Sequence, residues 1–133
     1  MKYGALYQDL YSVFSSPAWV AESINTYPEN YVGDGGSEYI RVTPLASGES
    51  INIESVSGII QIEIFVAAGL GPARGRQIAD KLDQHLAGKT FTLTEGRCTQ
   101  FLSSAFAGMG NDKDNPSLFR SLYSISFLHF GVQ

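Results

Sequence analysis

A glycine-rich turn carries the residues best placed to do chemistry. It reads Gly-Leu-Gly-Pro-Ala-Arg-Gly over residues 69–75, between a predicted strand and a predicted helix. Free N–H groups at a helix start can bind phosphate. A dinucleotide site, however, has the pattern G-x-G-x-x-G, and Arg74 stands where its third glycine would be. Pro72 also lacks an N–H group. A turn that starts a helix explains these residues, and an anionic ligand held at 69–76 is the alternative.

The other reactive side chains do not form a recognisable catalytic or metal-binding set. Cys98 is the only cysteine, so no disulfide can form within the chain. His85 and His129 have no cysteine or acidic partners at metal-ligand spacing. Residues 111–114 resemble a calcium loop in composition but lack its closing glutamate. No Ser–His–acid or Cys–His motif is present. We therefore expect no enzymatic activity, no cofactor and no metal.

A strand and a helix flank the glycine turn and organise the rest of the chain. Alternation predicts a strand whose buried face carries Ile60, Ile62, Ile64 and Val66. From Ala73 the apolar spacing becomes helical, with a stripe made of Ile78, Ala79, Leu82 and Leu86. Gly88 is expected just past the helix end. The two elements should pack on each other.

The segments before this unit predict a helix, an irregular stretch and two strands. The helix is expected over residues 2–15, and a short helical turn near Trp19 opens an irregular stretch that lasts to residue 36. Strands are expected at 38–45 and 51–55, where Pro44 indicates a strand end or a sheet edge. With the central strand they form a three-stranded antiparallel meander.

The segments after the unit predict three more strands and a loop. The strands are expected at 90–95, less clearly at 100–106, and at 118–130. Residues 107–116 have little to bury and are expected to form a mobile loop. The chain of 133 residues is then a single domain over 1–133. Its predicted fold class is α+β, a twisted, mainly antiparallel sheet of four to six strands with two helices packed on one face.

The composition favours a protein that works through contacts. Charged residues make up 17% of the chain, and a charge-poor surface suits burial against partners. The net charge of -4 argues against a general nucleic-acid binder. The N-terminus does not resemble a signal peptide, and no stretch approaches the roughly 20 apolar residues of a membrane span. We expect a soluble, cytoplasmic protein.

Two groups of residues are candidates for contact with another subunit. Tyr3, Tyr7 and Tyr11 recur every four residues along the first helix. The favoured interpretation is that these tyrosines rim the core with their hydroxyls in water, and the alternative is a contact row, because tyrosine is enriched at interfaces. Leu122 and Leu128 lie on the second apolar face of residues 118–130. A strand that is apolar on both faces is central or is covered by another subunit.

Five segments carry a resemblance to a known family. The first two are the helix over 3–14 and a stretch with Trp19, Pro28 and Asn30. The others are EYIRVTPL at 38–45, GIIQIEIFVAAGLG at 58–71 followed by the helix RQIADKLDQHLAG at 76–88, and SISFLHF at 124–130. In their order and in their patterns of apolar residues, these segments resemble the tail terminator (tail completion) proteins of long-tailed bacteriophages. The resemblance covers most of the chain and rests on packing patterns, because no single motif is diagnostic.

The resemblance implies a structural part of a virion. Such subunits form a hexameric ring that caps the tail tube, ends its polymerisation and offers a surface to the head–tail connector protein, while DNA passes through the lumen without specific binding. Its partners are then other copies of the chain and the tail tube protein. The protein is expected in the host cytoplasm during assembly and in the virion tail afterwards. Candidates for charge pairs across subunits are Arg74, Arg76, Glu49 and Glu54. Alternatives are a small ligand-binding or enzymatic domain and a related head–tail adaptor.

Overall fold

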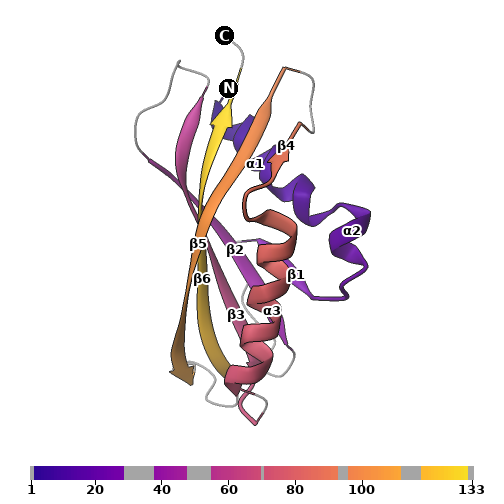
Figure 1. Cartoon of the computed structure of the whole chain (residues 1–133), viewed down its shortest axis with the longest axis vertical. Helices are drawn as coiled ribbons and strands as arrows, with labels where there is room; N and C mark the ends of the chain where they lie inside the picture. Colours follow the sequence, from indigo (N-terminus) through magenta and orange to yellow (C-terminus); the bar gives the residue numbers. More distant parts are fainter. Residues whose placement is uncertain are drawn as a thin grey trace.

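A single curled sheet of six strands forms the frame of the molecule (Figure 1). The computed structural model describes residues 2–28, 38–47, 55–69, 71–92, 96–111 and 118–131. The strand order is β1-β2-β3-β6-β5-β4. The strands are β1 (Thr26–Pro28), β2 (Tyr39–Ser47), β3 (Val56–Ala67), β4 (Thr90–Phe91), β5 (Cys98–Asn111) and β6 (Leu118–Phe130). All neighbours are antiparallel except β1 and β2, which are parallel. The sheet confirms the predicted α+β class.

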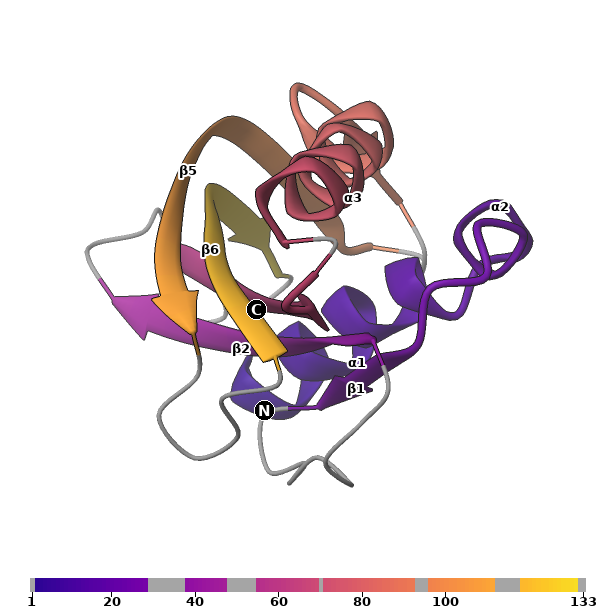
Figure 2. The same cartoon turned by 90° about the horizontal axis from the view of Figure 1, so that it is seen from below.

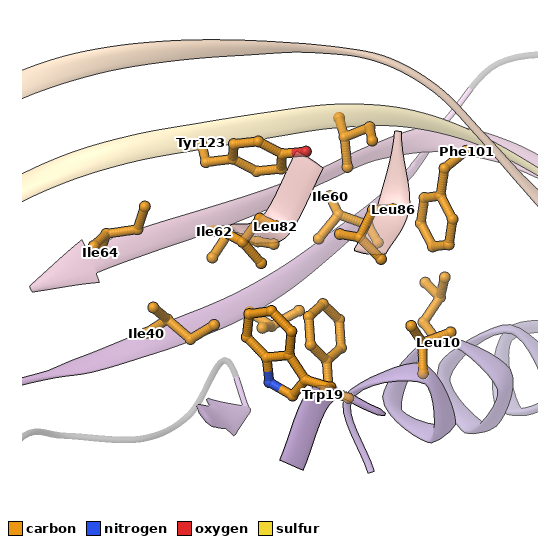
Figure 3. Packing of buried hydrophobic residues seen from close by; sticks show 14 of the residues in the cluster. Leu10, Trp19, Ile40, Ile60, Ile62, Ile64, Leu82, Leu86, Phe101 and Tyr123 are labelled. Carbon is orange, nitrogen blue, oxygen red and sulfur yellow. The ribbon is translucent and has the colours of Figure 1, made fainter. Parts of the chain in front are cut away.

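Three helices complete the described fold, and the two long ones share one core beneath the sheet. They are α1 (Lys2–Phe14), α2 (Pro17–Val20) and α3 (Gly71–Leu86). Leu10 of α1 and Leu82 of α3 belong to the same buried cluster as Ile60 of β3 (Figure 3). Figure 2, which views the molecule from below, shows the curl of the sheet and the two long helices, α1 and α3. The prediction of two helices packed on one face is therefore confirmed.

The predicted central strand forms as expected, with one correction. Its four apolar residues at 60, 62, 64 and 66 are fully buried in the main core. Alternation places Phe65 with Gln61 and Glu63 on the opposite, polar side of the strand, yet it is only 2% exposed. It lies in a second, small cluster with Tyr39 and Leu118, and its ring stacks on Tyr39 at 4.6 Å between centroids. Aromatic residues thus cover part of the sheet face that the helices leave open.

The predicted meander is wrong in its pairing. Residues 39–47 pair directly with residues 57–65, so no strand stands between β2 and β3 there. The strand expected at 51–55 falls outside the described residues apart from Ser55, which is not in a strand. Pro44 does not end β2, but it lies beyond the register of β1, which stops at Val42. Among the described residues, no strand lies outside Pro44, in line with the sheet edge predicted from this proline.

Two other segments differ from expectation. Residues 26–28 were placed in an irregular stretch but form β1, and residues 107–111 were placed in a loop but extend β5. β-Bulges interrupt the pairing of β5 and β6 on either side of residues 104–108, and this irregularity hides the strand from a simple alternation test. The strand expected at 90–95 is described only as Thr90–Phe91. Helix α3 begins at Gly71, before the expected Ala73, and Gly88 follows its end with a φ of 70°.

Candidate functional site

The sheet face opposite the helices is the first candidate surface. Leu45 and Ile59 face each other across β2 and β3 and are 44% and 42% exposed. Leu122 and Leu128 lie on the same face of β6 and are half-buried. All three described helices pack elsewhere, because their buried residues belong to the core on the other face. Leu122 and Leu128 thus lie on the predicted second face of a strand that is central in the sheet, and their contact with another subunit stays a prediction.

Three charged residues tie adjacent strands together on that same face. Nε of Arg41 in β2 donates to Glu63 Oε1 at 2.8 Å. Nε of Arg120 in β6 donates to the other oxygen of Glu63, also at 2.8 Å. The Arg41 guanidinium lies 5.3 Å from the centre of the Phe65 ring, within cation–π range. Two guanidinium groups thus share one carboxylate. This network could not be predicted from the sequence, because its residues are far apart in the chain.

The tyrosine row on α1 is split by the fold. Tyr7 and Tyr11 are half-buried and pack against the core, with their ring centroids 6.2 Å apart. The Tyr11 hydroxyl donates to the carbonyl oxygen of Val42 at 3.3 Å. Tyr3 is 55% exposed. Tyr7 and Tyr11 therefore rim the core, while Tyr3 presents most of its ring outward, and a subunit contact through the row stays a prediction.

The glycine turn starts α3 and directs Arg74 back to the sheet. Nε and Nη2 of Arg74 donate to the two oxygens of Glu38 at 2.8 and 2.9 Å. Hydrogen bonding to Glu38 raises the pKa of Arg74, which stays charged. Its guanidinium is thus engaged by a carboxylate of the same chain. Arg76 is exposed, whereas Glu49 and Glu54 lie outside the described residues. Charge pairing of these residues across subunits stays a prediction.

A cavity of about 210 Å³ opens between α3 and β5. Asp83 accepts hydrogen bonds from the Tyr123 hydroxyl and from Ser104 Oγ, each at 2.6 Å. Burial, and then the bond to Asp83, raises the pKa of Tyr123 well above its usual value. Among the lining residues Arg76 faces two acids, Asp80 and Asp83. This acidic balance gives no support to an anionic ligand, because carboxylates repel it.

The outer edge of β5 is the candidate surface that the sequence did not reveal. Strand β4 pairs only with Thr99 and Gln100, at one end of β5. Three apolar side chains farther along are exposed, Leu102 at 37%, Phe106 at 40% and Met109 at 51%. The whole of β5 contains no charged residue and no proline. The lack of charge and proline was the feature of the sequence that could have revealed this edge, because natural edge strands normally carry charges or proline that prevent unwanted pairing.

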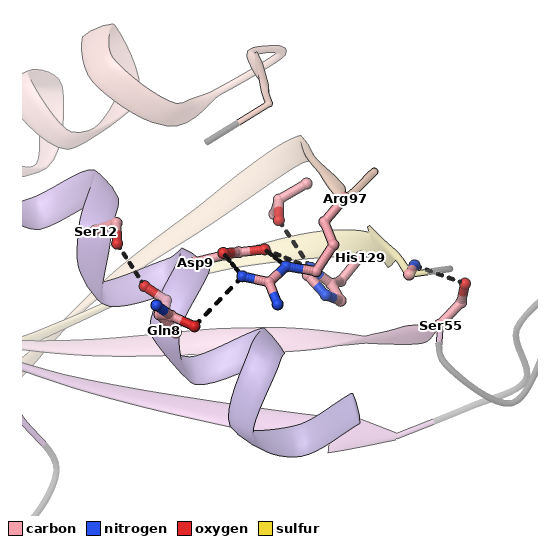
Figure 4. A network of polar contacts seen from close by, with 8 residues as sticks. Gln8, Asp9, Ser12, Ser55, Arg97 and His129 are labelled. Carbon is pink, nitrogen blue, oxygen red and sulfur yellow. Dashed lines mark hydrogen bonds and ion pairs between the residues drawn. The ribbon is translucent and has the colours of Figure 1, made fainter. Parts of the chain in front are cut away.

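A buried polar network fastens α1 to the end of the sheet (Figure 4). Asp9 is 3% exposed and accepts from Nε and Nη2 of Arg97 at 3.0 and 2.9 Å. His129 Nδ1 lies 2.9 Å from Thr99 Oγ1 and 3.9 Å from Asp9. Burial lowers the pKa of His129, although the Asp9 charge opposes this. Because His129 is only 1% exposed, we interpret the network as one that holds α1 against β5 and β6.

The described part of the chain contains no cluster of three or more histidine, cysteine, aspartate or glutamate residues able to hold a metal ion. Cys98 is a half-buried free thiol. No helix in the described ranges is both long and apolar enough to cross a membrane.

Comparison with known proteins shows the fold alone. No protein-family model matches the chain, and no curated protein matches it. A solved structure superposes with a TM-score of 0.60, covering 91% of this chain and 86% of its own. Its sequence is 12% identical. At that identity the similarity establishes a shared architecture and says nothing about activity.

Proposed function

We propose that the chain is a structural subunit of a bacteriophage tail. Copies form a ring, expected to be a hexamer, that caps the tail tube, ends its polymerisation and offers a joining surface to the head–tail connector. DNA passes through the ring without specific contacts. The resemblance of the sequence segments suggests the family, and the fold supplies one supporting observation.

That observation is the one-sided construction of the sheet. Both long helices pack on one face, and the other carries exposed Leu45 and Ile59 as well as half-buried Leu122 and Leu128, with Ser124 and Ser126 between the two leucines of β6. Exposed apolar side chains on a sheet face that no described helix covers suit an interaction site. A subunit that associates with copies of itself accounts for this one-sided construction.

The direct test is tube length in a reconstituted assembly. Tail tube protein of the same phage would be polymerised with and without the purified chain, and tubes would be measured by electron microscopy. We expect tubes of limited length with a ring at one end when the chain is present. Light scattering should give the mass of the ring. Tubes of unchanged length, together with a chain that stays monomeric at high concentration with tube protein present, would refute the proposal.

A further inference from the structure

The strongest unexplained feature outside the proposed tube and connector contacts is the bare edge of β5. Backbone bonds from Phe101 N to Lys89 O and from Gly88 N to Leu102 O close the edge as far as residue 102. From Ser103 to Asn111 no described strand pairs with it (Figure 1). At about 3.3 Å per residue this edge is roughly 30 Å long. Figure 1 shows β4 beside the other end of β5.

The chemistry of this edge is that of a strand that takes a partner. An exposed edge offers unpaired N–H and C=O groups, which readily add a further strand. Charged side chains or proline would prevent this, and β5 has neither. Phe106 and Met109 are 40% and 51% exposed, so they would lose apolar surface to water on pairing. In a protein of net charge -4, a neutral strip is also where two copies repel each other least.

The opposite side of the sheet offers a second such stretch on β2, which the register places level with residues 100–105 of β5. A neighbouring copy must therefore be displaced along the strands to bring the two stretches together. Strand β1 reaches only Val42, and residues 43–47 continue β2 with no described strand outside them. This stretch is also free of charge, and its Leu45 is 44% exposed. The backbone N–H of Ile40 points away from β3 and donates to Asn25 O. Because backbone groups alternate in direction along a strand, the backbone groups of Pro44 and Ala46 also point away from β3. Pro44 supplies only a carbonyl, which keeps the available ladder short.

The directions of the strands make these two edges compatible. β2, β3, β6 and β5 are successive antiparallel neighbours, so β2 and β5 run in opposite directions. If one copy follows another in the same orientation, β5 of the first therefore meets β2 of the second antiparallel. The contact joins two unlike patches. Such a head-to-tail contact closes into a ring when the rotation between copies permits.

We infer that the outer edge of β5, from Ser103 to Asn111, pairs with the outer edge of β2, at residues 43–47, of a second copy of the chain. The inference rests on the proposed ring and names the surfaces that build it. The sheet then continues from subunit to subunit. Two β5 edges meeting about a two-fold axis would instead give closed dimers, which the test below distinguishes.

Matched alanine-to-lysine variants test the two edges. Ala107 on β5, Ala46 on β2 and Ala18 on α2 are all exposed, so each lysine can be accommodated in the folded monomer. Sedimentation and light scattering would follow assembly with and without tail tube protein. We expect Ala107→Lys and Ala46→Lys each to weaken self-association by about tenfold or more, with unchanged thermal stability. Ala18→Lys should assemble like the unmodified chain.

Amide hydrogen exchange separates strand pairing from a mere side-chain contact. Amides within residues 103–111 should exchange more slowly in the assembled chain than in the diluted chain. Loss of assembly in Ala107→Lys alone would overturn the pairing with β2. Normal assembly of both edge variants, or unchanged exchange at 103–111, would overturn the inference while leaving the ring itself intact. A chain that never assembles and does not limit tube length would instead refute the proposed function.

Discussion

Gly58 is the residue at which the fold leaves least room. A Cβ added there would overlap the carbonyl oxygen of Leu45 and press on the backbone of Ala46. Since these atoms belong to the paired strand β2, they cannot rotate away. We predict that Gly58→Ala lowers the free energy of unfolding by about 1–3 kcal/mol, measured by urea denaturation.

Gly4 provides a matched control for that prediction. It lies in α1, and nothing lies within 4 Å of a Cβ added to it. Alanine is a better helix former than glycine by about 0.8–1.0 kcal/mol, so Gly4→Ala should leave stability unchanged or raise it. If both variants behaved alike, the close approach of β2 and β3 at Gly58 would not be real.

His129 should make stability depend on pH in the mildly acidic range. Burial lowers its pKa in the folded chain below the ordinary value of 6.5. Below about 6.5 the unfolded chain therefore binds more protons than the folded one, so stability falls as the pH decreases. Glu22, whose pKa is lowered by hydrogen bonds from Lys81 and His85, adds its own loss only below its ordinary value of 4.5. The window between 6.5 and 4.5 thus reports mainly on His129.

Two histidine variants would check that assignment. Urea denaturation between pH 8 and pH 5 should show the free energy of unfolding of the native chain decreasing below about pH 6.5. His129→Gln removes the titrating group and should flatten this decrease. His85→Gln should retain it, because His85 is half-buried against Glu22 and is a different site. A decrease that persists in His129→Gln would contradict the assignment.

The ion pair between Arg74 and Glu38 joins the start of α3 to the start of β2. The side chains are 27% and 29% exposed, so water screens the pair. We predict a coupling energy of about 0.5–1 kcal/mol in a double-mutant cycle with Arg74→Ala and Glu38→Ala, measured by urea denaturation of the monomer. Arg76→Ala serves as an exposed control on the same helix. A coupling near zero, with assembly lost in Arg74→Ala, would assign Arg74 to a contact between subunits.

The elements with strict periodicity could be predicted from the sequence, and the irregular ones could not. The strand at 118–130 has the predicted bounds, and α1 and α3 begin and end within a few residues of expectation. β5 was underestimated because Gly108 and Gly110 are typical of loops and because bulges break its alternation. β1 consists of three residues and forms only because β2 lies beside it. Such a strand depends on tertiary contacts that local sequence cannot encode.

The candidate site was predictable to a smaller extent. Leu122 and Leu128 were found because alternation assigns each residue of a strand to a face. The partners of charged residues were not, since Arg120 is 57 positions from Glu63 and Arg97 is 88 from Asp9. Phe106 and Met109 were missed together with their strand. Periodicity predicts which side chains face the core, whereas pairings between distant segments require the folded chain.

Taken as a whole, the molecule has no charged residue within the strand stretches that it leaves open, although Asp83 of α3 accepts a hydrogen bond from Ser104 on one of them. Glu63 neutralises one of the two positive charges of Arg41 and Arg120 within the sheet face, and Glu22 ties the end of α2 to α3 through Lys81 and His85. Both open edges, at 43–47 and 103–111, are uncharged. The net charge of -4 is therefore carried elsewhere on the surface. This distribution makes the effect of salt on self-association informative.

Raising the salt concentration should strengthen self-association of the whole chain. Copies of like charge repel each other, and added salt shortens the range of this repulsion from about 10 Å at 0.1 M to about 3 Å at 1 M. Contacts through neutral edges lose nothing to screening, so the association constant should rise between 0.1 M and 0.5 M sodium chloride, as measured by sedimentation equilibrium. If the subunits were instead held by ion pairs of Arg74 or Arg76 with acids of a neighbouring copy, the same change would weaken assembly. The sign of the salt effect thus separates an interface of strand edges from an interface of charges.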